Sequence, residues 1–522
     1  MKRIYSLFSF LTIGLCVLLS SCSNYSRKGY QYNYDNYESV AQSQMPVFDY
    51  ADSEEYPAFE ENRFLSAQKH PLSTFSLDVD VASYGNMRRI INQGKIPSEE
   101  VIRTEELINY FSYDYPEPTG EHPVNIVTEV APCPWKDRHK IVKIGIKAKE
   151  IPTDNLPHSN FVFLIDVSGS MYGPTRLELV KSSLKLLVNN LRDTDRVAIV
   201  VYAGAAGEVL PSTKGKDRQK ILEALADLTA GGSTAGGEGI KLAYEIASKN
   251  FIPQGNNRII LCTDGDFNVG ISSTSELEKL IESKRKTGIY LTILGYGMGN
   301  YKDDNLQTLS QKGNGNHAYI DNIQEANKVL VQEFGSTMYA VANDVKLQIE
   351  FNPAHVSYYR LIGYETRLLN DEDFNDDQKD AGELGSGHTV TALYEIIPVG
   401  VENPYNREVD DLKYQKERTN VNDYSSEMLT VKLRYKKPGE SESKKLEVPV
   451  ASIPDETQTV SKDFKFALSV AMFGQLLRNS EFKGDATYSK VIDLAKEGID
   501  NDEYGYRREF VRLVEVVNQM AK

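Results

Sequence analysis

Phe161-Val-Phe-Leu-Ile-Asp-Val-Ser-Gly-Ser-Met171 is the stretch of this 522-residue chain that decides its fold. Five apolar residues run directly into an aspartate and two serines, as in a buried strand that ends in a polar loop. A second run of this kind, Arg258-Ile-Ile-Leu-Cys-Thr-Asp-Gly-Asp266, passes through Asp264. We interpret both runs as parallel strands, because strands covered on both faces are apolar throughout. Asp166 and Asp264 then lie at carboxyl ends, the edge where open α/β sheets bind ligands.

Strand-like and helix-like patterns alternate on either side of these two runs. The predicted strands are 160–166, 196–202, 257–263, 290–296 and 317–320, and the predicted helices are 176–192, 218–228, 238–250, 275–287, 304–312 and 323–335. This alternation predicts an α/β domain over residues 158–340, with a doubly wound, mostly parallel sheet and right-handed crossovers.

Five separated residues are expected to meet at the ligand-binding edge of that sheet. Asp166, Ser168 and Ser170 come from the first run, Asp264 from the second, and Thr234 from the glycine-rich Gly231-Gly-Ser-Thr-Ala-Gly-Gly-Glu238. Their hydroxyl and carboxylate oxygens are hard donors, which suit Mg²⁺ or Mn²⁺ and suit zinc or copper poorly. The plainer alternative is that the first three residues only cap the following helix. The complete set favours a divalent metal site.

The region 158–340 resembles a von Willebrand factor type A domain, whose metal-ion-dependent adhesion site uses five positions of this kind. All five are kept in this sequence. The resemblance implies that the cation stays electrophilic when both carboxylates stand behind water. It also implies that a Glu or Asp carboxylate of a partner protein completes the metal coordination.

The first 22 residues have the pattern of an export signal. Lys2 and Arg3 precede the apolar stretch 7–19, which is short for a membrane span. Leu19-Ser-Ser-Cys22 matches the lipobox of bacterial lipoproteins. We expect cleavage before Cys22 and attachment of acyl chains such as palmitate, which would hold the exported protein on a membrane. A simple secretory signal or a short signal anchor is the alternative.

The remaining segments flank the α/β domain. Residues 23–68 are rich in Tyr, Asn, Ser and Glu and are expected to be a flexible polar tether. An N-terminal α+β segment is predicted over 70–150, an antiparallel β region over 344–455, and two amphipathic helices within 462–522. Within these segments we expect strands at 74–81, 124–129, 140–147, 345–351, 358–364, 389–398 and 428–435, and helices at 101–111, 462–480 and 487–521.

Two further groups of acids imitate metal motifs. Asp78, Asp80 and Ser83 have similar spacing but no partner loop, so polar strand faces are favoured over a second metal site. Residues 370–377 are dense in carboxylates, yet Asp376 replaces the turn glycine of an EF-hand loop, and a solvated acidic loop is favoured. Whether Cys133 and Cys262 form a disulfide is left open.

The resemblance extends along nearly all of the mature chain. The order of lipobox, tether, Ser76-Leu-Asp-Val-Asp-Val-Ala-Ser-Tyr84, type A domain and trailing β and helical parts is similar to the YfbK-type bacterial lipoproteins. Thr104-Glu-Glu-Leu-Ile-Asn-Tyr-Phe111 and the stretch 380–395 also resemble this family. The resemblance implies an envelope lipoprotein with an adhesion-type domain, and it brings no settled partner.

Function is predicted to be binding and not catalysis. A formal charge of -15 argues against nucleic acid as a partner. The sequence lacks a Gly-x-Ser-x-Gly elbow, a His-Glu-x-x-His motif and a phosphate-binding glycine loop, and His317 and His388 are expected to be structural strand residues. The alternatives are a hydrolase in the flanking segments, or a regulatory subunit of an envelope complex; a subunit beside a cytoplasmic ATPase conflicts with export. Ser23 and Asn24 favour an outer-membrane anchor facing the periplasm, with surface display second.

Overall fold

The computed structural model describes most of the chain after residue 53. The described residues are 54–56, 58–77, 80–232, 236–265, 274–299, 301–379, 381–405, 426–451 and 460–522. The predicted signal peptide with Cys22, and the tether as far as residue 53, lie outside them. None of the helices in the described ranges combines the length and the apolar character that a membrane crossing requires.

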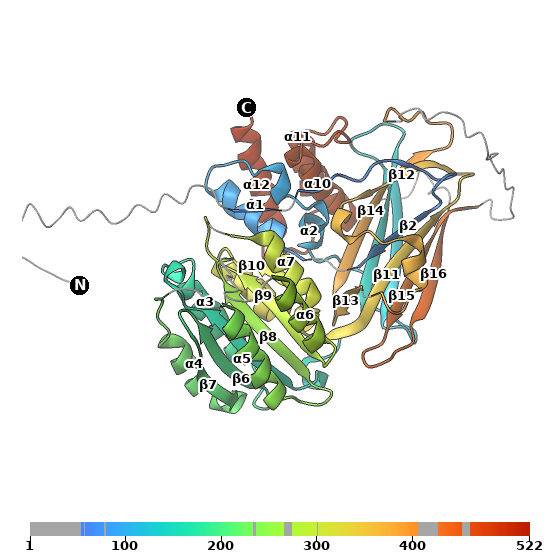
Figure 1. Cartoon of the computed structure of the whole chain (residues 1–522). Helices are drawn as coiled ribbons and strands as arrows, with labels where there is room; N and C mark the ends of the chain where they lie inside the picture. The colour runs from blue at the N-terminus through green and yellow to red at the C-terminus, as the bar shows by residue number, and fades with distance from the viewer. Residues whose placement is uncertain are drawn as a thin grey trace, which may run out of the picture. The chain divides into compact units, whose positions relative to one another are not determined.

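A six-stranded sheet forms the core of the α/β domain, in the order β10-β9-β8-β5-β6-β7 (Figure 1). Its strands are β5 (Ser159–Asp166), β6 (Arg196–Tyr202), β7 (Ala206–Lys214), β8 (Asn256–Thr263), β9 (Ile289–Gly295) and β10 (His317–Tyr319). All neighbours are parallel except β6 and β7. The predicted doubly wound, mostly parallel fold is confirmed. The antiparallel edge strand β7 was not predicted, because none of its residues is buried and it has no sustained apolar period.

Helices cover both faces of this sheet. They are α3 (Leu177–Asn189), α4 (Arg218–Ala226), α5 (Gly236–Lys249), α6 (Thr274–Arg285), α7 (Asp303–Lys312), α8 (Ile323–Asn327) and α9 (Phe334–Met338). Phe161 and Phe163 of β5 pack with α3, α4 and α8, while Val162 and Leu164 pack with α5, α6 and α7. The helix expected over 323–335 is interrupted, since a π-helical turn, Lys328–Gln332, separates α8 from α9.

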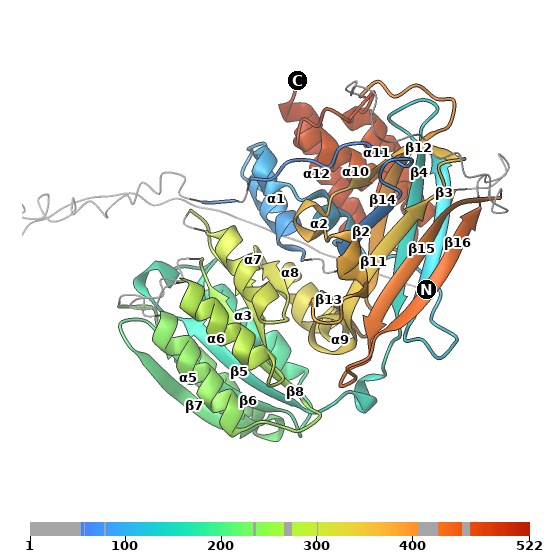
Figure 2. The same cartoon turned by 45° about the vertical axis from the view of Figure 1, so that its right-hand side comes forward.

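The segments on either side of the α/β domain build one β sandwich together. One sheet has the order β1-β12-β14-β4-β3, and the other has β13-β11-β15-β16 with β2 paired to β11 (Figure 2). The strands are β1 (Leu65–Ser66), β2 (Leu72–Ser76), β3 (Val124–Pro132), β4 (Lys140–Ala148), β11 (Ala340–Phe351), β12 (Val356–Ile362), β13 (Gly382–Gly385), β14 (Thr389–Pro398), β15 (Glu427–Lys436) and β16 (Lys444–Ala451). The predicted segments 70–150 and 344–455 are therefore not separate units, because antiparallel pairing of β4 with β14 joins them.

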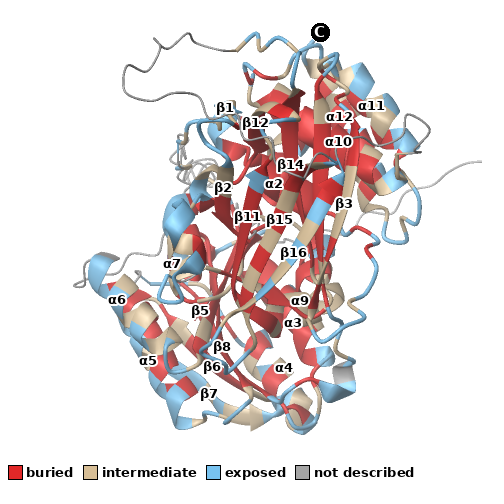
Figure 3. Cartoon of the chain, turned by 90° about the vertical axis from the view of Figure 1, so that its right-hand side faces the viewer, coloured by how far each residue is buried: buried red, intermediate tan, exposed pale blue. Residues whose placement is uncertain are grey.

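A helical layer packs on the outer face of the first sheet. It contains α1 (Ala82–Asn92), α2 (Thr104–Asn109), α10 (Lys462–Leu477), α11 (Tyr488–Glu497) and α12 (Tyr506–Met520). Burial is nearly complete along β11, β14 and α10 (Figure 3). The strand expected over 74–81 ends at Ser76, and α1 was not predicted. The helix expected over 487–521 is two helices, and Gly505 with φ +78° begins the second.

The folded part begins before the end of the predicted tether. Asn62 donates a hydrogen bond from Nδ2 to the carbonyl of Gly363 at 2.8 Å, Leu65 pairs with Tyr359, and Ala67 is fully buried. The expectation of a flexible tether up to residue 68 is wrong for these residues, since they add an edge strand to the sandwich. Cys133 and Cys262 are both buried and free, in two different hydrophobic clusters, so they form no disulfide.

Candidate metal site

The first three predicted ligands lie in one loop at the carboxyl end of β5. Asp166 is the last residue of that strand and is fully buried. The backbone amide of Ser168 donates to Oδ1 of Asp166 at 2.9 Å, which fixes the carboxylate. The hydroxyl oxygens of Ser168 and Ser170 are 3.0 Å apart. These three side chains thus lie together in one loop.

Asp264 reaches the same edge from the neighbouring strand. It follows β8, which ends at Thr263 and runs parallel to β5 with Ile165 opposite Cys262. The hydroxyl of Thr263 lies 3.4 Å from Oδ2 of Asp166, and Asp264 is fully buried. Parallel pairing of the two strands therefore brings the two predicted carboxylates to one end of the sheet.

The fifth predicted ligand, Thr234, lies outside the described residues. The backbone just before it is described. Gly231 donates its N–H to the carbonyl of Val167 at 2.7 Å, and Gly169 donates to the carbonyl of Gly232 at 3.0 Å. The loop that leads into Thr234 is thus hydrogen-bonded to the loop that carries Ser168 and Ser170. Gly232 has φ +92°, a conformation that favours glycine.

The electrostatics of this edge suit a cation. Burial raises the pKa of Asp166 to about 6; hydrogen bonds from Ser168 oppose that rise, and the charge of Asp264 adds to it. Hydroxyl and carboxylate oxygens are the donors that Mg²⁺ and Mn²⁺ prefer. The donor set therefore fits a magnesium-type ion. Among the described residues no group of three or more His, Cys, Asp or Glu side chains gathers as a metal cluster.

Arg176 connects the loops of this site, and no pattern in the sequence predicted its role. Its Nη1 donates to the carbonyl of Ser170 at 2.8 Å and its Nη2 to the carbonyl of Met298 at 2.7 Å, while its Nε is 3.8 Å from Oδ2 of Asp264. A Cβ added to Gly297 would lie 2.6 Å from this Nε. Glycine at 297 therefore leaves room for the arginine beneath the site.

The acids that imitate metal motifs have structural partners. Asp80 is buried and accepts hydrogen bonds from Nη2 of Arg367 at 2.9 Å and from the amide of His317 at 2.8 Å; Asp78 is outside the described residues. Ser83 donates to the carbonyl of Val101 at 2.6 Å. This group serves packing, although α1 and not a strand carries Ser83. In the acidic stretch 370–377 most carboxylates are exposed, as expected, but residues 371–375 form a short helix with Phe374 buried.

The two histidines singled out in the sequence are buried to different degrees: His317 is fully buried and His388 is half-buried. Nε2 of His317 is 2.7 Å from the hydroxyl of Tyr301, and burial lowers the pKa of this histidine. His388 lies in the turn before β14 and not on a strand. Burial lowers the pKa of His388 to about 4, and the charges of Lys328 and Lys147 lower it further.

Comparison with known proteins identifies the class. The model of the von Willebrand factor type A domain matches residues 160–333, a model described as von Willebrand factor matches 50–143, and the C-terminal model of the uncharacterized protein YfbK matches 336–520. The protein carries a von Willebrand factor type A domain inserted into a β sandwich. Domains of this class typically mediate protein–protein interaction and adhesion.

The chain belongs to the YfbK family: it is 41% identical over 471 residues to the uncharacterized protein YfbK of Escherichia coli (strain K12), covering 89% of this chain and 81% of that protein. It is 28% identical over 222 residues to the uncharacterized protein sll0103 of Synechocystis, covering 42% of this chain and 52% of that protein. A von Willebrand factor type A structure from Catenulispora acidiphila is 17% identical, with a TM-score of 0.40, covering 73% of this chain and 88% of that one.

Proposed function

We propose that this protein binds a partner protein through a divalent cation, Mg²⁺ or Mn²⁺, held by Asp166, Ser168, Ser170, Thr234 and Asp264. A Glu or Asp carboxylate of the partner would complete the coordination. The observation that carries the proposal is the convergence of Asp166, Ser168, Ser170 and Asp264 at one sheet edge. Adhesion, scaffolding or envelope assembly are the processes that such docking would serve.

The site combines neutral hydroxyl donors with charged carboxylates, and the two kinds of group would have different roles in binding the cation. The hydroxyls of Ser168 and Ser170, 3.0 Å apart, would supply neutral oxygens to the cation. Asp166 is oriented by the backbone amide of Ser168. Together with Asp264 it would neutralise part of the cation's charge through bound water. The bound cation would supply positive charge that attracts an anionic side chain. Because the nearest donors are neutral, that attraction would remain strong.

The surface beside the site suits protein contact. Tyr172, two residues after Ser170, is 82% exposed, and Met298, whose carbonyl holds Arg176, is 42% exposed. Tyrosine and methionine are enriched at protein interfaces, where large side chains contribute much of the contact area. An exposed tyrosine next to the cation would pack against the partner around its carboxylate.

Binding is favoured over the alternative of a hydrolase in the flanking segments. The described scaffold contains a histidine–carboxylate pair, Nδ1 of His139 with Oε1 of Glu395, 2.6 Å apart. Both side chains are buried, and Arg360 Nη2 and Trp135 Nε1 also donate to Glu395. A pair enclosed in this way stabilises the sandwich and offers no route to a substrate.

The anchor remains part of the proposal. Lipidation of Cys22 would attach the chain to the cell envelope, with an outer-membrane anchor facing the periplasm as first choice and the cell surface as second. A regulatory subunit of an envelope complex would use the same docking chemistry, so it is a variant of this function.

Calorimetric titration of Mg²⁺ and of Mn²⁺ into the full-length chain in detergent tests the metal site. We expect one binding site in the wild type, its loss in Asp166→Ala, and its retention in Asp227→Ala, an exposed aspartate at the end of α4. Circular dichroism should show the same fold in all three proteins. An unchanged titration in Asp166→Ala would refute the assignment.

A further inference from the structure

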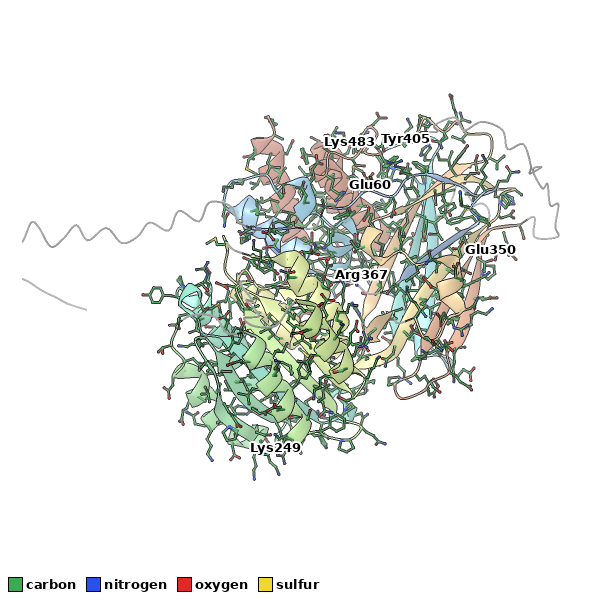
Figure 4. All side chains as sticks on the ribbon, viewed as in Figure 1. Glu60, Lys249, Glu350, Arg367, Tyr405 and Lys483 are labelled. Atoms are coloured by element: carbon green, nitrogen blue, oxygen red, sulfur yellow. The ribbon has the colours of Figure 1, made fainter. Side chains whose placement is uncertain are left out.

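A second site lies at the opposite edge of the same sheet, where the strands begin. A cavity of about 350 Å³ opens between the first residues of β8, the last residues of α6 and α7, and strands β11 and β13 of the sandwich. Arg367, labelled in Figure 4, lies at this junction. A cavity of this volume has the size of a small-molecule site.

The charged side chains that line this cavity are mainly cationic, in a chain whose formal charge is -15. Arg258, Arg285, Lys312, Arg367 and Lys379 line it, against the carboxylates of Glu282 and Glu383. Five cationic side chains against two carboxylates give the cavity lining an excess of positive charge. The excess therefore points to an anionic occupant.

Four of these cations have other partners. Arg367 Nη2 is 2.9 Å from Asp80 Oδ2, and Lys312 Nζ is 2.7 Å from Glu282 Oε1. Lys379 Nζ is 3.6 Å from Asp373 Oδ2. Nη1 of Arg285 donates to Asn314 Oδ1 at 3.1 Å. These contacts hold the walls of the cavity in place.

Arg258 differs from these four cations because its guanidinium has an unsatisfied N–H group. Its side chain is only 2% exposed, and its Nη1 donates to the hydroxyl of Thr292 at 2.7 Å. Its Nε is buried without a hydrogen bond, and none of the ion pairs among the described residues includes Arg258. The carboxylate charge of Glu383, which also lines the cavity, acts on this guanidinium without direct contact. The ring of Tyr290 is 5.5 Å away. A buried guanidinium with an unsatisfied N–H is unfavourable, so a ligand oxygen that accepts from this Nε would bind favourably.

We propose that this cavity binds a small oxyanion, a molecule with a carboxylate or phosphate group, through Arg258. Guanidinium groups bind both oxyanions through paired N–H donors. Arg285 and Lys312 would add charge from α6 and α7. This site is separate from the metal site, because Arg258 lies near the beginning of β8 and Asp264 follows its end.

Calorimetric titration of inorganic phosphate and of succinate into the full-length chain in detergent tests the proposal. Metal-free buffer without a chelator and constant ionic strength keep the metal site empty during the measurement, and the two titrants distinguish a phosphate ligand from a dicarboxylate. We expect a single saturable site for at least one of them, unchanged in Asp166→Ala. In Arg258→Met binding should weaken about 10- to 100-fold, the effect of losing a charge-assisted hydrogen bond. Arg63→Met removes an exposed arginine elsewhere and should change nothing.

The stability of the ligand-free variant separates a binding role from a structural one. If Arg258 serves a ligand, Arg258→Met should melt at the same temperature as the wild type or higher, because a buried unpaired charge is lost. If Arg258→Met does not fold, Arg285→Gln should weaken the same anion site in a folded protein. Absence of saturable binding of both anions to the wild type, or equal affinity in the wild type and the variants, would overturn the proposal.

Discussion

Replacing Arg103 by methionine should loosen the joint between the type A domain and the sandwich. Arg103 precedes α2 and is 1% exposed. Its Nη1 is 2.6 Å from Oδ2 of Asp303, the first residue of α7, and its Nε donates to Oε1 of Glu106. Nε2 of Gln307 on α7 also donates to Oε1 of Glu106, at 3.3 Å. The guanidinium therefore neutralises one carboxylate from each part of the molecule.

The expected cost follows from this geometry. Arg103→Met keeps the aliphatic stem but leaves Glu106 and Asp303, both buried, without their cation. Removing one member of a buried ion pair costs about 3–5 kcal/mol, because the remaining charge stays buried. An unfolding entropy of about 2.1 cal/mol/K per residue gives roughly 1 kcal/mol/K over the compact unit Ala51–Lys522. The melting temperature should therefore fall by about 3–5 °C.

Differential scanning calorimetry measures this change. Arg63→Met, which breaks an exposed pair with Glu60, should cost no more than about 1 kcal/mol and serves as the control. Adding Asp303→Asn to Arg103→Met should recover part of the loss, because it removes a stranded charge. A melting temperature for Arg103→Met equal to that of Arg63→Met would refute the reasoning. So would a double variant less stable than Arg103→Met alone.

Two further substitutions test the metal site and the sandwich. Gly297→Ala would place a methyl group against Arg176, which hydrogen-bonds to the Ser170 loop, so Mg²⁺ affinity measured by calorimetry should fall about 10- to 100-fold. The control is Gly94→Ala, because Gly94 has a similar positive φ but open space around it. An equal loss of Mg²⁺ affinity in Gly94→Ala would contradict the argument. His388 has a pKa lowered to about 4, so between pH 6.5 and 4 the unfolded chain binds more protons and wild-type stability falls as pH falls. In His388→Gln the urea-unfolding midpoint should fall less steeply as pH falls, whereas the exposed control His70→Gln should keep the wild-type pH dependence. An unchanged pH dependence in His388→Gln would count against the burial of His388 as the cause of the decline.

Local patterns predicted the α/β domain well. Strands such as β5 and β8 are covered on both faces, so they are apolar without interruption and their ends are marked by Asp166 and Thr263. Strand β7 was not predicted because an edge strand needs few apolar residues. Helix α1 was not predicted because the stretch before it alternates like a strand. Helices 323–335 and 487–521 were predicted as unbroken because their apolar periods continue along the sequence. In the structure a π-helical turn interrupts the first helix, and a loop beginning at Gly498 interrupts the second.

The sequence by itself was enough to place Asp166, Ser168, Ser170 and Asp264 as candidate metal ligands, because strand ends and short loops are marked by local patterns. Only the tertiary structure decided that β4 pairs with β14, with Ile144 opposite Ala392, across the whole inserted domain. It also decided the placement of Arg176 beneath the metal site and of Arg258 in a cationic cavity. Pairing between distant segments is set by shared burial in one core, and no local period records which strand a given strand will meet.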